Sequence, residues 1–87
     1  MGFKKLRGVP LPEEKQGLIR YTCLTYDEQP QRVQRKIDRI LQDAGGEYAE
    51  ALRLVMLTRR SITEIALHCH VSEETLYRLR RRFYLCW

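Results

Sequence analysis

Apolar residues recur with a helical period in the last third of the chain, in two runs separated by a short break. The apolar positions of this stretch are Ile62, Ile65, Ala66, Cys69, Val71, Leu76, Leu79 and Phe83. This spacing predicts a short helix with one inward face, an apolar Val71 in a tight turn, and a second helix with an i, i+3, i+7 stripe.

The residues that precede these two helices predict where each one begins. Ser61 is followed three residues later by Glu64, which is the spacing of a capping box, so we expect the first helix to start at Ile62. Ser72 is in a position to cap the second helix. The two glutamates that follow it would lie in the first turn, where the helix dipole favours negative charge.

Two amphipathic helices are expected upstream, over residues 28–44 and 47–59. Asp27 is a candidate cap for the first of them, Pro30 is tolerated in its first turn, and the pair Gly45–Gly46 should end it. The inward face of the first consists of Val33, Ile37, Ile40, Leu41 and Ala44. That of the second consists of Tyr48, Ala51, Leu52, Val55 and Met56, widened by Leu54 and Leu57. These helices would complete an all-α fold, a small helical bundle over residues 27–87, because an isolated pair of helices buries too little surface to fold.

Residues 1–26 are expected to form an N-terminal arm or a partly irregular segment. Glycines and prolines at Gly2, Gly8, Pro10, Pro12 and Gly17 should interrupt any regular element before residue 18. The apolar residues over 18–26 then predict a short helix or an extended segment laid against the bundle. Lys4, Lys5 and Arg7 form a basic arm that could reach a DNA minor groove, but we favour a solvated, disordered terminus.

Length and charge narrow the classes of function. The 87 residues provide for one domain, with 16 Lys and Arg against 11 Asp and Glu and a net charge of +5. Residues 57–87 hold six of the arginines and three glutamates, and four of those arginines lie within residues 78–82. This clustering favours a polyanionic partner. The sequence has no apolar run of membrane-spanning length and no signal-peptide core, so we expect no membrane partner and a cytoplasmic location.

Cysteine and histidine do not point to a cofactor. Three widely spaced cysteines make a disulfide framework improbable and fit a reducing compartment. The triplet His68-Cys69-His70 contains zinc-ligand residue types, but no second pair lies at zinc-site spacing and Cys69 is needed as an apolar position of its helix. The chain also lacks a phosphate-binding glycine loop, a nucleophile elbow and an acid pair beside a histidine. We therefore expect no metal, no cofactor and no enzymatic activity.

The segment SITEIALHCHVSEETLYRLRRRFY resembles the helix-turn-helix superfamily of DNA-binding proteins. Members have a small residue where this chain has Ala66, then an apolar residue in the turn and two in the second helix. They usually have glycine in the turn, where this chain has His70, a residue that tolerates the left-handed backbone region. The layout is similar to small activators of the ArpU/RinA type, which are related to sigma-factor region 4. That resemblance implies sequence-specific promoter binding by a phage or mobile-element transcription regulator. The implied partner is double-stranded DNA, with RNA polymerase and a second copy of the chain as further candidates.

The residues predicted to contact DNA lie opposite the apolar stripe of the second helix. That face carries Glu74, Tyr77, Arg78 and Arg81, with Ser72, Glu73 and Thr75 at its tip. Arg78 is suited to a bidentate contact with guanine, Glu74 to accept from the cytosine amino group, and Tyr77 to meet a thymine methyl group or a phosphate. Phosphate contacts are expected from Arg81, Arg82, Arg59, Arg60 and Thr63. A solvated helix face is the alternative for each arginine, and for the glutamates helix capping is the favoured role.

Other classes of function remain open on the sequence. A small terminase-like DNA-packaging subunit would normally continue into an oligomerisation region, and an excisionase-like factor would usually add a wing hairpin. A protein-binding module that inhibits a host protein would need an exposed apolar patch, for which the C-terminal residues 84–87 are candidates. The dependence of binding affinity on salt concentration distinguishes DNA binding from protein binding. Affinity that depends on several phosphate contacts falls steeply as salt rises, whereas an apolar protein contact should not weaken in this way.

Overall fold

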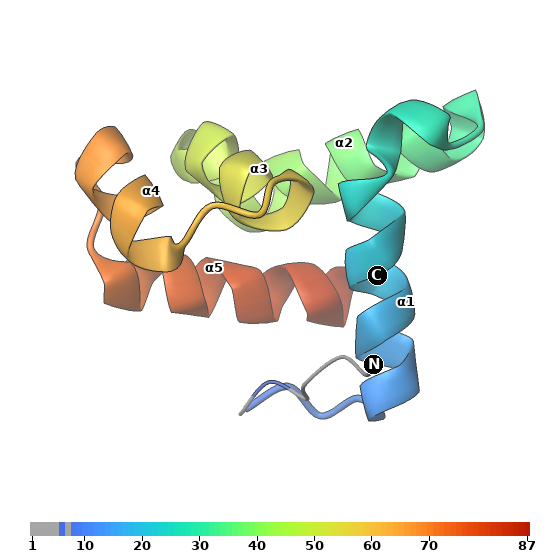
Figure 1. Ribbon diagram of the computed structural model, residues 1–87, viewed down its shortest axis with the longest axis horizontal. Helices are drawn as coiled ribbons and strands as arrows, with labels where there is room; N and C mark the ends of the chain where they lie inside the picture. The colour runs from blue at the N-terminus through green and yellow to red at the C-terminus, as the bar shows by residue number, and fades with distance from the viewer. Residues whose placement is uncertain (1–5, 7) are drawn as a thin grey trace.

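The computed structural model describes Leu6 and residues 8–87, and this part of the chain is helical without strands (Figure 1). The α-helices are α1 (Glu13–Leu24), α2 (Gln31–Gly45), α3 (Ala49–Leu57), α4 (Ile62–Cys69) and α5 (Glu73–Cys86). Two 3₁₀ helices, η1 (Tyr26–Glu28) and η2 (Gly46–Tyr48), lie between them. The all-α fold class predicted from the sequence is confirmed. A membrane span needs a longer and more apolar helix than any in the described part of the chain.

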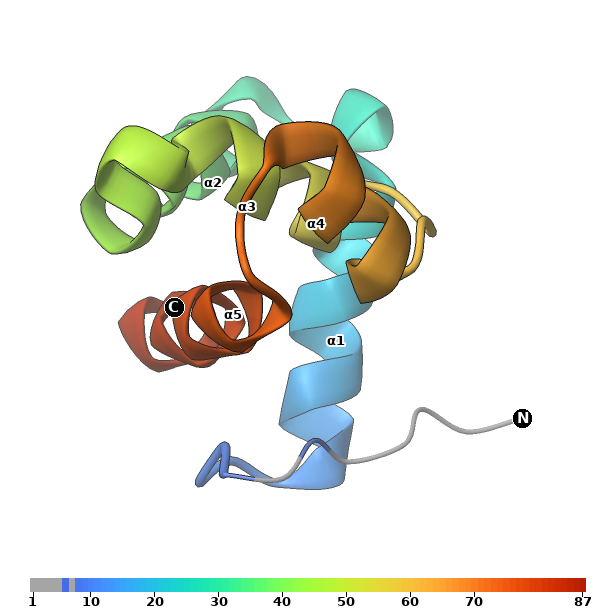
Figure 2. The ribbon, with the colours of Figure 1, turned by 90° about the vertical axis from the view of Figure 1, so that its left-hand side faces the viewer.

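Helix α5 runs along one side of the molecule and contacts α2, α3 and α4. In Figure 1, α2 and α3 lie across from it, α4 lies beside its first turns, and α1 stands across its C-terminal end. The view turned by 90° looks nearly along α5 and shows α4 and α1 on the same side of it (Figure 2). One face of α5 therefore meets the bundle.

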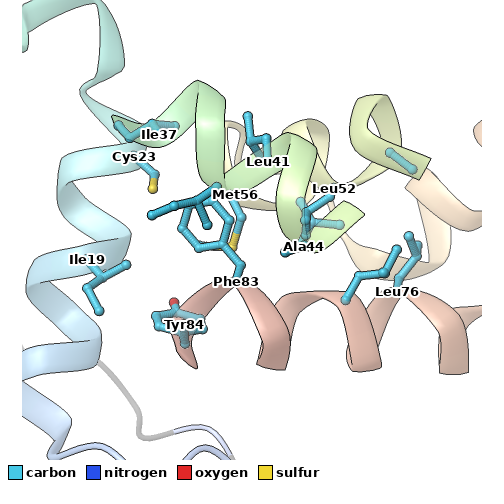
Figure 3. Close-up of a cluster of buried hydrophobic side chains, with 14 of the residues drawn as sticks. Ile19, Cys23, Ile37, Leu41, Ala44, Leu52, Met56, Leu76, Phe83 and Tyr84 are labelled. Carbon is cyan, nitrogen blue, oxygen red and sulfur yellow. The ribbon is translucent and has the colours of Figure 1, made fainter. Parts of the chain in front are cut away.

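Side chains from all five α-helices make one hydrophobic core (Figure 3). The inward stripe predicted for α2 is confirmed by four buried residues, Ile37, Ile40, Leu41 and Ala44, with Val33 packed at the edge. The buried residues of α3 are Ala51, Leu52, Val55 and Met56, as predicted. Tyr48 is the exception, because it is 40% exposed. It belongs to η2 and precedes the first turn of α3, so it does not share the inward face of that helix.

The start of α2 also differs from the prediction. Asp27 lies in η1 and does not cap α2, which begins at Gln31 after the extended Pro30. The carbonyl of Pro30 accepts hydrogen bonds from the backbone amides of Val33 and Gln34 in the first turn of the helix. The predicted end is confirmed, since α2 ends at Gly45 and Gly46 takes a positive φ of 56°.

Helix α1 corrects the expectation that glycines and prolines interrupt regular structure before residue 18. The helix starts at Glu13, directly after Pro12, and Gly17 lies within it. Its buried residues are Gln16, Ile19 and Cys23, which form an i, i+3, i+7 stripe. The apolar Leu18 and Tyr21 point outward and are 61% and 62% exposed.

The buried amide of Gln16 holds the segment that precedes α1. Its Oε1 accepts from the Leu6 amide at 2.9 Å, and its Nε2 donates to the carbonyls of Val9 at 3.3 Å and Leu11 at 2.9 Å. Val9 is buried in the core. Residues 8–11 are therefore attached to α1 by side-chain hydrogen bonds and by apolar contact. The predicted basic arm, Lys4, Lys5 and Arg7, lies outside the described residues.

Arg20 joins α1 to the C-terminal end of α3. Its guanidinium donates to the carbonyls of Val55, Met56 and Thr58, the last two at 2.9 Å. Carbonyls of a last helical turn have no partners within their helix, and positive charge there is favourable. Burial lowers the pKa of Arg20 from its ordinary value, against the opposing effect of the nearby Tyr84. This contact fixes the linker that leads into α4.

The last residues of the chain close one end of the core. Tyr84 is 2% exposed and meets the Phe83 ring edge-on. The Trp87 ring lies 6.2 Å from that of Phe83, and the ammonium of Lys36 lies 4.3 Å from its centroid. Leu85 remains 47% exposed, so residues 84–87 are divided between core and surface.

Candidate nucleic-acid interface

The caps predicted for α4 and α5 are both present. The hydroxyl oxygen of Ser61 accepts from the Glu64 amide at 3.1 Å, and α4 begins at Ile62. The Ser72 oxygen accepts from the Thr75 amide at 3.1 Å. Each bond satisfies one of the amides that a helix leaves without a partner at its N-terminus.

The turn between α4 and α5 depends on His70. This residue has φ 57° and ψ 43°, in the left-handed region, as predicted for a position where glycine is usual. The reversal lets the amide of Val71 donate to the carbonyl of Ala66 at 3.1 Å. Such a bond ends a helix by satisfying a carbonyl of its last turn. Three residues, 70–72, therefore redirect the chain from α4 into α5.

The packing of α4 on α5 leaves one face of α5 exposed. Ile65, Leu76, Leu79 and Phe83 are buried, while Ile62, Ala66, Cys69 and Val71 are partly buried against the core. The inward positions expected from the periodicity thus all pack inward. Ala66 lies on the packed side of α4, where its small side chain suits a close approach between helices.

Most of the residues predicted to contact DNA are on the surface. Ser72, Glu73, Glu74, Tyr77, Arg78, Arg81 and Arg82 are exposed, and Thr75 is partly buried. Arg59, Arg60 and Thr63 are also exposed, in the linker before α4 and in its first turn. Tyr77, Arg78 and Arg81 come together around one surface hollow, whereas Arg59, Arg60 and Thr63 do not line it.

The arginines of α5 are not neutralised within the described residues. The ion pair found there joins Arg53 and Asp38 at 3.2 Å, away from α5. Arg78 donates to the Thr75 hydroxyl at 3.4 Å, and the Nε of Arg81 donates to the carbonyl of Gly8. Neither partner carries charge, so the outward face of α5 keeps its positive charge.

Arg80 is the residue of this helix that sequence reasoning left without a role. It is half-buried, and its guanidinium lies 5.1 Å from the ring centroid of Tyr77. Burial lowers the pKa of Arg80, while the neighbouring Tyr84 and Tyr77 oppose the shift. The sequence pattern that indicates this half-buried position is the i, i+4 spacing of Leu76, Arg80 and Tyr84. It places Arg80 between two buried residues on one side of α5.

The hollow that Arg80 lines is bounded by Val9, Tyr77, Arg78, Arg80 and Arg81, with a volume of about 430 Å³. Val9 comes from the segment held by Gln16, and the other four residues come from α5. No carboxylate is among the lining residues. The hollow therefore combines positive charge, an aromatic ring and an apolar wall.

Metal-ligating side chains do not gather in residues 6 and 8–87, where no three His, Cys, Asp or Glu lie close enough to hold an ion. Of the triplet considered in the sequence, His68 and His70 are exposed and Cys69 is partly buried against the core.

Comparisons of the chain with models of protein families, with curated proteins and with solved structures found no match. Function is therefore inferred from the geometry of α4 and α5 and from the chemistry of their exposed side chains.

Proposed function

We propose that this protein binds double-stranded DNA in a sequence-specific manner as a small transcription regulator, with α4, the turn at His70 and α5 acting as a helix-turn-helix. One observation carries the proposal. Helix α5 buries Leu76, Leu79 and Phe83, and it presents to solvent a tyrosine and three arginines without acidic partners in the described chain, Tyr77, Arg78, Arg81 and Arg82. A capped, exposed, arginine-rich helix is suited to the major groove.

The dimensions and residue types of α5 support this role. Its 14 residues span roughly 21 Å at the rise of an α-helix. Near its N-terminus, Arg78 is suited to guanine, Tyr77 to a thymine methyl group or a phosphate, and Glu74 to the cytosine amino group. Glu73 is assigned to the helix dipole, because a carboxylate in the first turn is favourable without any DNA contact.

Phosphate contacts hold such a helix in register on the duplex. Arg81 and Arg82 continue the basic face of α5, and Arg59, Arg60 and Thr63 add exposed groups at the start of α4. The resemblance to ArpU/RinA-type activators supports a phage or mobile-element regulator, with RNA polymerase and a second copy of the chain as candidate partners. A cytoplasmic site of action follows from that role.

The experiment that tests the proposal is selection of bound sequences from a pool of random duplexes, followed by affinity measurements over a series of salt concentrations. We expect a defined consensus and a steep fall in affinity with rising salt. A palindromic consensus would add evidence for a dimer. Absence of any enriched sequence, together with salt-independent capture of a protein, would instead favour the protein-binding alternative.

Arg78→Ala tests the assigned recognition face. We expect a loss of about 1–3 kcal/mol at the selected site and relaxed preference at one base pair. Arg82→Ala should instead weaken binding to all sequences equally and reduce the salt slope by about one. Arg39→Ala, an exposed arginine of α2, is the matched control for a change of one charge. If Arg78→Ala weakens selected and random duplexes equally, Arg78 contacts phosphate and the specificity lies elsewhere.

A further inference from the structure

The hollow on α5 gathers three arginines around one space, whereas a basic helix can be exposed to solvent without forming such a hollow. Three arginines, Arg78, Arg80 and Arg81, line about 430 Å³ of space together with Tyr77 and Val9. Like charges repel, and no carboxylate among the lining residues offsets the charge of these three arginines. An anion in the hollow would remove that repulsion.

Arg80 is the most informative of the three. Its guanidinium is half-buried, and within the described residues it has no hydrogen-bond acceptor. A guanidinium has donors on all three nitrogens, and no buried side-chain nitrogen in the described residues lacks a partner, so the free donors of Arg80 are open to solvent and to a ligand. Arg80 also borders a smaller cavity of about 100 Å³ with Arg20 and Tyr84, which has no lining carboxylate either. Arg80 therefore lies beside two spaces, neither of which is lined by a carboxylate.

The walls of the hollow are held in place before any ligand arrives. The Arg81 side chain donates to the carbonyl of Gly8, and Gln16 binds the carbonyl of the next residue, Val9. Arg80 rests on the Tyr77 ring. Side chains that are already positioned lose less conformational freedom when they bind a ligand.

We propose that this hollow is a binding site for the phosphate group of a phosphate ester, with Arg80, Arg78 and Arg81 as its ligands. The planar fork of arginine matches the oxygen spacing of a phosphate, and charge-assisted hydrogen bonds are the strong ones. The identity of the ester rests on the proposed function. In a DNA complex it is a backbone phosphate, and the other source is a free phosphate compound.

The test follows the side-chain Nε–H signals of the arginines by NMR while inorganic phosphate replaces chloride at constant ionic strength. The whole chain should show saturable shifts for Arg80 and Arg78. Arg80→Gln should weaken phosphate binding about tenfold, the usual effect of losing one charge-assisted hydrogen bond. Arg39→Gln removes the same charge from an exposed position of α2 and should leave the phosphate affinity unchanged.

A second variant keeps the result interpretable if Arg80→Gln fails to fold. Arg78→Gln changes an exposed residue of the same hollow and should also weaken phosphate binding. Shifts that do not saturate in the whole chain would overturn the site. Equal affinities in the Arg78→Gln, Arg80→Gln and Arg39→Gln proteins would overturn it as well.

Adding the selected duplex distinguishes the sources of phosphate and separates this inference from the proposed function. Displacement of bound phosphate by the duplex identifies a DNA phosphate as the natural ligand, whereas simultaneous binding identifies a free phosphate compound. If the duplex binds but inorganic phosphate does not, the proposed phosphate site in the hollow is refuted, while the proposed DNA binding is supported. If phosphate binds but no duplex does, the proposed function fails while the site stands.

Discussion

Arg20→Met should destabilise the protein far more than removal of any exposed arginine. Methionine keeps an apolar stem and removes the guanidinium that donates to the carbonyls of Val55, Met56 and Thr58. Hydrogen bonds to charged groups contribute about 1.5–3 kcal/mol each, but Arg20 is only partly buried and water can reach some of the released carbonyls. We therefore expect a total loss of about 2–4 kcal/mol, less than the sum of three bonds.

Such a loss is large for a domain of this size, whose total stability is on the order of 5–10 kcal/mol. It corresponds to a fall in melting temperature of about 10–25 °C. Circular dichroism during thermal and urea unfolding measures it, with Arg39→Met as the control at an exposed site. The melting temperature of Arg20→Lys should lie between those of the wild type and Arg20→Met. Lysine keeps the positive charge at the end of α3 but lacks the several N–H donors of a guanidinium. A melting temperature for Arg20→Met within about 3 °C of the wild type would refute the reasoning.

Three further predictions concern the helix junction and the core. Ala66→Leu should overpack the approach of α4 to α5 and cost about 1–3 kcal/mol, measured by urea unfolding; an unchanged midpoint would refute the proposed packing. His70→Gly should raise stability by up to about 1 kcal/mol, because glycine adopts the observed φ of 57° without strain, and a lower melting temperature would contradict this. Burial raises the pKa of Cys23 from 9.0 to about 12, so the unfolded chain releases this proton first as pH rises. The free energy of unfolding should therefore decline above about pH 9. In urea titrations between about pH 8 and pH 10, this decline should be smaller for Cys23→Ala than for the wild type.

The junction of α4 and α5 was predictable because its determinants are local. The hydroxyls of Ser61 and Ser72 cap amides three residues ahead, and His70 accommodates a single left-handed position. Each of these contacts spans a few residues and leaves a recognisable sequence pattern. The apolar faces of α2, α4 and α5 follow the helical period for the same reason. These parts of the fold, with the exposure of most candidate residues, could be read from the chain.

A short helix was one of two predictions for residues 18–26, but the start of α1 at Glu13 was missed because its inward face does not look apolar. The stripe of Gln16, Ile19 and Cys23 contains a polar residue, while Leu18 and Tyr21 face outward. Gln16 is buried because its amide satisfies the backbone of the segment ahead of α1. These hydrogen bonds join the Gln16 side chain to backbone groups five to ten residues earlier in the chain. The periodicity of apolar residues does not reveal such bonds. Prolines and glycines ahead of residue 18 predicted irregular structure, yet Pro12 is compatible with a helix start and Gly17 with a helix interior.

The candidate interface shows the same division between local and long-range determinants. The helical period alone places Arg78, Arg81 and Arg82 on the outward side of α5. It cannot show that Arg81 contacts Gly8, more than seventy residues earlier in the chain, or that Arg80 is half-buried above Tyr77. The Arg81 contact depends on where the segment ahead of α1 lies, and Gln16 binds that segment at Val9. The chemistry of the arginine-rich face is therefore set partly by residues that carry no charge and lie outside the two helices that present it. A change such as Gln16→Leu should accordingly alter the hollow on α5 while leaving the caps at Ser61 and Ser72 intact, since those caps need only their own helices.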